Sequence, residues 1–119
     1  MVFFPPAKLN LGLHITGKRD DGFHDLESVF LPIGWSDILE VILDEEVPQG
    51  QARFEWTGLA IPGNTDDNLV TRAHKRLAEA FDLPGVSIHL HKVLPMGGGV
   101  GGGSADGTYT LRALNDVCN

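Results

Sequence analysis

The sequence predicts an α+β fold in which helices cover one face of a mostly antiparallel sheet. Polar and apolar residues alternate in several segments of the first half, as they do in half-buried strands, and the apolar period becomes helical from residue 68. The resulting order is strands, helix, strand, glycine loop and helix. This order differs from the regular alternation of strand and helix in a doubly wound parallel fold, so the α+β class is favoured.

The first strand is expected over residues 8–16. Its alternation places Leu9, Leu11, Leu13 and Ile15 on one face, and Lys8, Asn10, Gly12 and His14 on the other. Lys8 follows two prolines, Pro5 and Pro6, which give the strand a rigid start. We therefore expect the Lys8 ammonium to be held beside Asn10. A solvated surface lysine is the ordinary alternative.

Three further strands are expected over residues 26–33, 38–43 and 52–57. A charged turn precedes the first of them, and residues 34–37 are expected to separate the first from the second. A hairpin or meander is the simplest arrangement. Within the turn, Phe23 and His24 could stack on or hydrogen-bond a planar ring, although an ordinary turn with a core phenylalanine is the alternative.

A helix is expected over residues 68–81, with Asp66 or Asp67 as its N-cap. Its apolar stripe would comprise Leu69, Ala73, Leu77, Ala80 and Phe81.

Alternation returns in residues 86–91, which predicts a strand with Val86, Ile88 and Leu90 facing inward. His89 and His91 would share its other side, where two imidazoles could bind a metal. Because no third ligand is evident nearby, a solvent-facing surface is favoured over a metal site.

Six of the fifteen glycines fall within residues 97–103, directly before a second helix expected over residues 104–115. Glycine accepts positive φ, so such a loop can turn successive N–H groups toward one anion, beside the positive end of the helix dipole. This predicts a phosphate cradle. A flexible linker is less favoured, because apolar residues enclose the run on both sides.

Two familiar phosphate loops do not fit this glycine run. A Walker loop ends in Gly-Lys-Ser/Thr, whereas this one ends Gly103-Ser104-Ala105. A dinucleotide fingerprint would need an acidic residue about twenty positions further on. Asp106 suits the helix dipole but would repel a bound phosphate unless a divalent cation lay between them.

The composition indicates one soluble domain of 119 residues, with 42% hydrophobic and 21% charged residues. A net charge of −7 argues against nucleic-acid and membrane-surface partners. The single cysteine, Cys118, is expected to be a free buried thiol, and no segment is apolar enough to span a bilayer. We expect a cytoplasmic protein.

Four motifs in order along the chain resemble the 4-diphosphocytidyl-2-C-methyl-D-erythritol kinases of the GHMP kinase superfamily. They are residues 6–11 (PAKLNL), 21–26 (DGFHDL), 67–70 (DNLV) and 94–104 (LPMGGGVGGGS). The glycine motif alone indicates the superfamily, and the first two motifs select this member. The resemblance covers essentially the whole chain and implies a ribosomal protein S5 domain 2-like lobe.

The resemblance further implies ATP-dependent phosphorylation of the 2-hydroxyl of 4-diphosphocytidyl-2-C-methyl-D-erythritol, in non-mevalonate isoprenoid biosynthesis. ATP and Mg²⁺ would be the cofactors. Lys8 matches the catalytic lysine, and Asn10, Phe23 and His24 match substrate-binding positions. The positions matching the ATP site are Asn68, Lys92, Pro95, Met96, Gly97, Gly98, Gly99, Val100, Gly101, Gly102, Gly103 and Ser104, of which Ser104 could also contact magnesium.

The sequence departs from the family in three ways. Phe23 replaces the commoner tyrosine, and Gly107-Thr108-Tyr109 stand where relatives usually have alanines. Relatives are also at least twice as long, and their catalytic aspartate and carboxy-terminal lobe lie beyond the second helix. Residues 1–119 are therefore expected to be an amino-terminal ATP-binding lobe with negligible activity alone. Two alternatives remain open: a non-catalytic nucleotide-binding module and an S5-like interaction domain. The chain could also self-associate through surface that the carboxy-terminal lobe normally covers.

Overall fold

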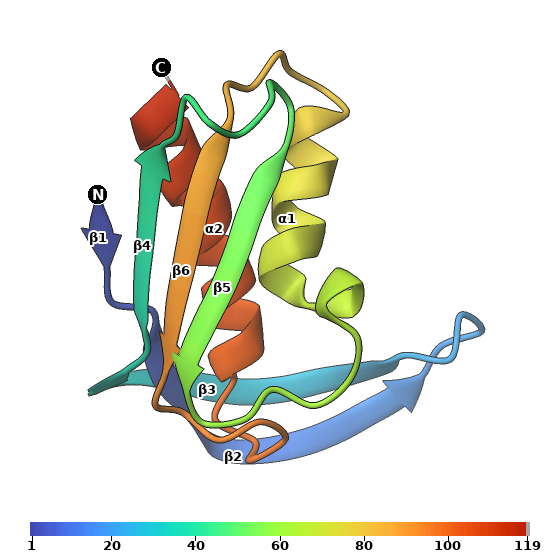
Figure 1. Ribbon diagram of the computed structural model, residues 1–119. Coiled ribbons are helices and arrows are strands. Elements are labelled where there is room, and N and C mark those ends of the chain that lie inside the picture. Colours follow the sequence, from blue (N-terminus) through green and yellow to red (C-terminus); the bar gives the residue numbers. More distant parts are fainter. Residues whose placement is uncertain (119) are drawn as a thin grey trace.

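The computed structural model describes residues 1–118, and Asn119, the last residue of the expected lobe, lies outside the described residues. Figure 1 shows the arrangement of the elements. In chain order they are β1 (Val2–Phe3), β2 (Pro6–Lys18), β3 (His24–Ser36), β4 (Ile38–Leu43), β5 (Ala52–Gly58), a 3-10 turn η1 (Thr65–Asp67), α1 (Leu69–Ala78), β6 (Val86–Lys92) and α2 (Gly102–Cys118).

The predicted α+β class with a mostly antiparallel sheet is confirmed. Four strands form a sheet in the order β1-β4-β6-β5, and both helices lie against one face of it (Figure 1). The pairs β1-β4 and β4-β6 are antiparallel, whereas β5 and β6 are parallel. The parallel pair follows from the connection between these strands, since a chain that passes through a helix can return in the same direction.

The core lies between this sheet and the helices. Val86, Ile88 and Leu90 point inward as predicted and are at most 2% exposed. They pack with Leu39 and Val41 of β4 and with buried side chains of both helices, namely Val70, Ala113 and Leu114. Burying each large aliphatic side chain contributes about 1.5–3 kcal/mol.

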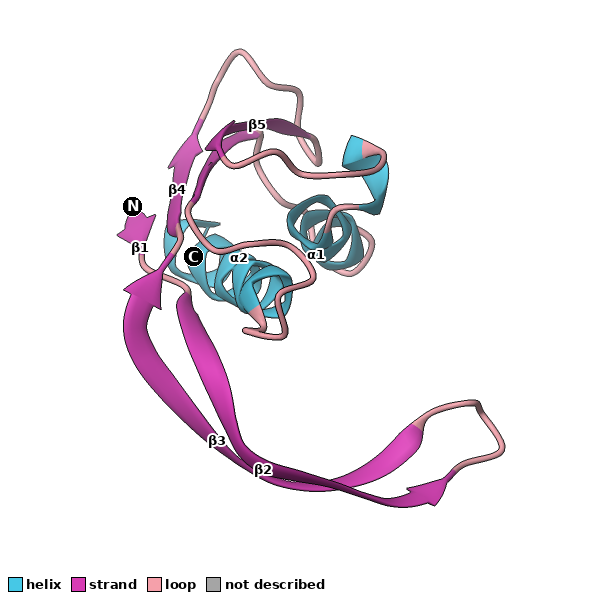
Figure 2. Cartoon of the chain, turned by 90° about the horizontal axis from the view of Figure 1, so that it is seen from below, coloured by secondary structure: helices cyan, strands magenta, loops and turns pink. Residues whose placement is uncertain are grey.

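Strands β2 and β3 form a separate two-stranded hairpin that extends away from the sheet and curves along its length (Figures 1 and 2). Both strands are longer than the sequence indicates. The expected separation at residues 34–37 is wrong, because β3 continues to Ser36 and only Asp37 lies between β3 and β4. The hairpin ladder continues to the pair Pro6 and Ser36, which keeps this segment extended.

A bulge at Gly12 changes the faces of the hairpin. Gly12 has φ +73°, and the register shifts between Leu11 and Leu13. An extra residue in one strand moves all later side chains to the opposite face. The expected single face of Leu9, Leu11, Leu13 and Ile15 is therefore wrong.

The cross-strand pairs give the corrected faces, since directly paired residues lie on the same side of a sheet. Lys8 and Asn10 share a face with Leu13 and Ile15, while Leu9 and Leu11 share the other with His14.

Helix α1 begins at Leu69, and its N-cap is Asn68 rather than Asp66 or Asp67. The Asn68 side chain accepts a hydrogen bond of 2.8 Å from the Val70 N–H. Asp66 instead forms an exposed ion pair with Lys75. The Asp66 and Asp67 backbones belong to η1, so neither can adopt the extended conformation of an N-cap.

The apolar stripe of α1 also differs from expectation. The buried residues are Val70 and His74, while Leu69 and Phe81 are exposed and Phe81 lies beyond the helix. Helix α2 begins two residues earlier and ends three residues later than predicted. None of the helices in residues 1–118 is long and apolar enough to cross a membrane.

Candidate phosphate-binding site

The glycine loop connects β6 to α2 and has the backbone that the sequence predicts. Gly97, Gly99 and Gly101 have φ values of 73°, 73° and 74°. Residues with larger side chains rarely adopt this left-handed conformation, which turns consecutive N–H groups toward one side. Helix α2 begins at Gly102, so the positive end of its dipole adjoins the loop. These features suit an anion.

Lys8 is joined to this loop through both its backbone and its side chain. Its N–H donates to the Val100 carbonyl at 2.8 Å, and its ammonium donates to the Gly99 carbonyl at 3.1 Å. The ammonium also donates to the Asn10 side-chain oxygen, which confirms that Lys8 and Asn10 share a face. Strand β2 therefore holds the glycine loop in place, which is not the behaviour of a free linker.

The close approach of Lys8 requires glycine at position 101. A Cβ on Gly101 would lie 3.0 Å from Lys8 Cε and 3.1 Å from Lys8 Cγ. The Lys8 ammonium also lies 5.2 Å from the centre of the Phe30 ring, within the range of a cation-π contact. The ring and the loop together fix the position of the ammonium.

Two cavities border the loop and the start of α2. One of about 400 Å³ is lined by Lys8 and by Pro6, Phe30, Gly101, Ser104, Ala105, Thr108 and Tyr109. The other, of about 100 Å³, is lined by Ile61, Pro62, Asp67, Asn68, Leu69, Lys92, Met96, Gly103 and Asp106. Ser104 is exposed in the first turn of α2. The predicted site residues Lys8, Asn68 and Lys92 thus line cavities together with the predicted loop and helix residues Met96, Gly101, Gly103 and Ser104.

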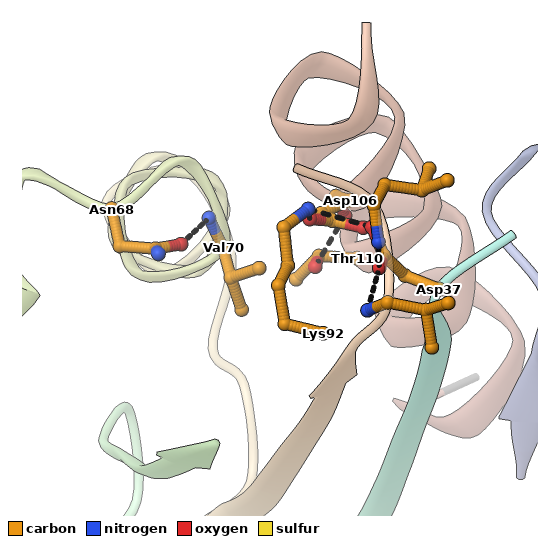
Figure 3. A network of polar contacts seen from close by, with 8 residues as sticks. Asp37, Asn68, Val70, Lys92, Asp106 and Thr110 are labelled. Atoms are coloured by element: carbon orange, nitrogen blue, oxygen red, sulfur yellow. Dashed lines mark hydrogen bonds and ion pairs between the residues drawn. The ribbon is translucent and has the colours of Figure 1, made fainter. Parts of the chain in front are cut away.

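Lys92 lies beneath the loop and is fully buried between two carboxylates (Figure 3). Its ammonium is 2.6 Å from Asp37 Oδ2 and 2.7 Å from Asp106 Oδ2. Its charge is therefore paired within the protein. Burial raises the pKa of the Asp106 carboxyl to about 6, although the hydrogen bond from Lys92 acts in the opposite direction.

Sequence reasoning missed this buried network, although one signal was present. Lys92 continues the inward series Val86, Ile88, Leu90 at a spacing of two, so alternation alone places it on the buried face. A buried lysine needs a partner of opposite charge. Asp37 gives no comparable signal, because it lies in a turn between strands where aspartate is common.

Phe23 and His24 are not brought next to Lys8. Lys8 pairs with Pro32 near the base of the hairpin and His24 pairs with Lys18 at its far end, so roughly 30 Å of strand separates them. The Phe23 ring is 68% exposed, and the Arg19 guanidinium lies 5.7 Å from its centre. The far end of the hairpin therefore presents an ordered aromatic ring to solvent.

His89 and His91 both contact the Thr57 hydroxyl, at 3.2 Å and 2.9 Å. Among residues 1–118, no three His, Cys, Asp or Glu side chains are grouped so that they could hold a metal ion. Cys118 is a half-buried free thiol, and burial raises its pKa.

Comparison with known proteins gives the class to which this fold and loop correspond. Residues 68–119 match the family described as GHMP kinases N terminal domain. The chain also matches a crystal structure of homoserine kinase from Cytophaga hutchinsonii with a TM-score of 0.63 and 20% identity, over 97% of this chain and 34% of that one. At that identity the match shows the fold alone. Together these matches show that residues 68–119 are similar to the amino-terminal domain of the GHMP kinases and that the fold is shared with one of them.

The particular member that the chain resembles is 4-diphosphocytidyl-2-C-methyl-D-erythritol kinase. This chain is 45% identical to the enzyme of that name from Cytophaga hutchinsonii, over 98% of this chain and 42% of the relative. It is 46% identical to the one from Bacteroides fragilis (strain YCH46), over 100% of this chain and 43% of that relative. A crystal structure of 4-(cytidine 5'-diphospho)-2C-methyl-D-erythritol kinase matches with a TM-score of 0.77 and 35% identity, over 98% of this chain and 40% of that one. The chain spans about 42% of the length of such curated relatives.

Proposed function

We propose that the chain is the ATP-binding part of a kinase that phosphorylates the 2-hydroxyl of 4-diphosphocytidyl-2-C-methyl-D-erythritol in isoprenoid biosynthesis. The observation that carries the proposal is that Lys8 donates hydrogen bonds to the glycine loop from both its backbone N–H and its ammonium. A binding module needs an anion cradle only. Phosphoryl transfer in addition needs a cation fixed beside that cradle, where charge develops between donor and acceptor.

The glycine loop and the first turn of α2 would hold the ATP phosphates. The left-handed glycines and the close approach at Gly101 support this fit, because any Cβ there would push into Lys8. The smaller cavity, beside Asn68 and Met96, would take the adenine base. The Ser104 hydroxyl is a hard oxygen ligand of the kind that Mg²⁺ prefers, and the ion would neutralise phosphate charge when it is bound.

The Lys8 face of the hairpin would hold the substrate. The Lys8 ammonium and the Asn10 amide are positioned to orient an acceptor hydroxyl at the larger cavity. His24 pairs onto this same face at the far end, where its ring nitrogens can read a pyrimidine edge beside Phe23. An elongated diphosphate ester lying along the curved hairpin would meet both ends (Figure 2).

The hairpin also supports self-association of the chain, which belongs to the same proposal. On the face opposite Lys8, its exposed apolar side chains are Leu9, Leu11, Val29 and Leu31. Contiguous exposed apolar surface commonly marks an interaction site. We further propose a cytoplasmic location, since a single cysteine suits a reducing compartment.

Transplantation of the chain into a relative tests the proposed reaction. In a chimera, the chain replaces the matching amino-terminal part of the Cytophaga hutchinsonii kinase, and formation of ADP and phosphorylated product is measured. We expect the chimera to phosphorylate the diphosphocytidyl substrate. Lys8→Met should lower its kcat/KM about 100-fold or more, since a preorganised donor at the reacting centre is lost.

The control is Lys75→Met in the same chimera, which removes an exposed lysine of α1. It should leave kcat/KM unchanged. A folded chimera that binds ATP but transfers no phosphoryl group would favour the non-catalytic nucleotide-binding module. Full activity of the Lys8→Met chimera would reject the role of Lys8.

A further inference from the structure

One group of buried charges holds both ends of the glycine loop. We call Asp37, Lys92 and Asp106 the loop clamp. At the end where the chain enters the loop, Asp37 Oδ1 accepts hydrogen bonds from the N–H groups of Val93 and Leu94, at 2.6 Å and 2.8 Å. At the end where the chain leaves the loop, Asp106 lies on α2, four residues after the helix begins. A carboxylate therefore lies at each end of the loop, Asp37 at its start and Asp106 on the helix that follows it.

Lys92 joins these two carboxylates. The side chains of Lys92 and Asp37 are 0% exposed and that of Asp106 is 3% exposed, so their contacts form in a low dielectric that strengthens them. The clamp connects the end of β6, the junction of β3 with β4, and α2 (Figure 3). A Cβ on Gly102 would lie 3.1 Å from the Lys92 ammonium nitrogen. The ammonium is therefore directly beneath the first residue of α2.

The position of Asp106 makes this pairing important for anion binding. A carboxylate in the first turns of a helix occupies the field that would otherwise attract a phosphate, and two negative charges at close range repel each other. The Lys92 ammonium supplies the compensating charge from within the protein. The helix terminus consequently remains receptive to an anion although an aspartate lies close to it.

We propose that Lys92 is a positioning residue of the glycine loop, which acts by fastening both ends of the loop through Asp37 and Asp106 and by neutralising Asp106. Lys92 itself does not touch the phosphates, because both carboxylates engage its ammonium. The proposal rests on the proposed function, since it takes the loop to be the ATP-phosphate site.

The fastening is tested by amide hydrogen exchange in the chain without ligand. Lys92→Gln should accelerate exchange over residues 93–103 more than in α1, where exchange should rise only as far as the global stability falls. Asp116→Asn is the matched control, because it removes a carboxylate from the exposed end of the same helix, and it should change neither region. Equal exchange of the loop in wild type and Lys92→Gln would overturn the fastening role.

The electrostatic role is tested by the affinity for ATP, measured by calorimetry. In alkaline buffer, where the Asp106 carboxyl stays ionised, Lys92→Gln should weaken ATP binding about tenfold or more, because the Asp106 charge is then unpaired. Adding Asp106→Asn should restore most of the affinity but not the slow exchange of the loop. If Lys92 had only a structural role, removing the Asp106 charge would not restore ATP affinity to Lys92→Gln. The same low affinity in the double variant therefore overturns the electrostatic role.

Two milder variants decide the matter if Lys92→Gln does not fold. Gly102→Ala alters no charge, but its Cβ would lie 3.0 Å from Leu94 Cβ and 3.1 Å from the Lys92 ammonium nitrogen, so it should both weaken ATP binding and accelerate loop exchange. Asp106→Asn alone keeps the Lys92–Asp37 pair and should bind ATP at least as tightly as wild type. Weaker ATP binding by Asp106→Asn than by Gly102→Ala would contradict the proposal. If the wild type binds no ATP, the proposed function fails, whereas loop exchange still decides whether Lys92 fastens the loop.

Discussion

Replacement of Lys92 by methionine is expected to lower the free energy of unfolding by about 3–5 kcal/mol. The variant keeps most of the side-chain volume but leaves Asp37 and Asp106 buried without their cation. Because domains of this size are stable by only about 5–15 kcal/mol, such a loss removes a large share of the total. Urea unfolding followed by tryptophan fluorescence and circular dichroism measures it.

Lys75→Met is the matched control for this prediction. It removes a lysine that forms a 3.1 Å ion pair with Asp66, but the Lys75 side chain is 54% exposed and the Asp66 side chain is 70% exposed. Exposed ion pairs contribute about 0–1 kcal/mol, so the urea concentration at the midpoint of unfolding should change little. Similar losses in the two variants would show that the buried pairing of Lys92 has no special weight.

Gly58→Ala is expected to lower the free energy of unfolding by about 2–5 kcal/mol, combining backbone strain with overpacking. Gly58 has φ +84°, and a Cβ there would lie only 2.2 Å from the Lys92 carbonyl oxygen. That carbonyl accepts the Leu59 N–H at 2.8 Å, so it cannot move away without losing a hydrogen bond. Denaturant unfolding gives the loss in stability.

Gly63→Ala separates strain from overpacking. Gly63 has a similar φ of +93°, but nothing lies within 4 Å of a Cβ built on it. Its substitution should cost about 1–2 kcal/mol, from the backbone conformation alone. If Gly58→Ala is no more harmful than Gly63→Ala, the close contact with Lys92 is not a real constraint.

Local patterns predict much of this fold because they reflect which side of an element is buried. The inward residues of β6 are found by simple alternation, and the turn of the glycine loop follows from its composition. The position of Lys8 beside Asn10 likewise follows from the two-residue period of a strand. In each case the information lies within a few consecutive residues.

The features that could not be predicted depend on residues distant in sequence. The bulge at Gly12 reverses the faces of the hairpin, and it is visible only in the register with β3. Asp37 and Lys92 are 55 residues apart, so no local pattern joins them. Asn68 replaces Asp66 and Asp67 as the N-cap because η1 occupies the preceding residues. Tertiary contacts decide these cases.

The central claim is that Lys8 and the glycine loop form one phosphate-binding unit, and calorimetric titration of the chain with Mg-ATP tests it most directly. We predict saturable binding that Lys8→Met weakens about tenfold or more, since a hydrogen bond from a charged group contributes about 1.5–3 kcal/mol. Lys18→Met, at the far exposed end of the same strand, should leave the affinity unchanged. Equal affinities of wild type and Lys8→Met for Mg-ATP would contradict the account.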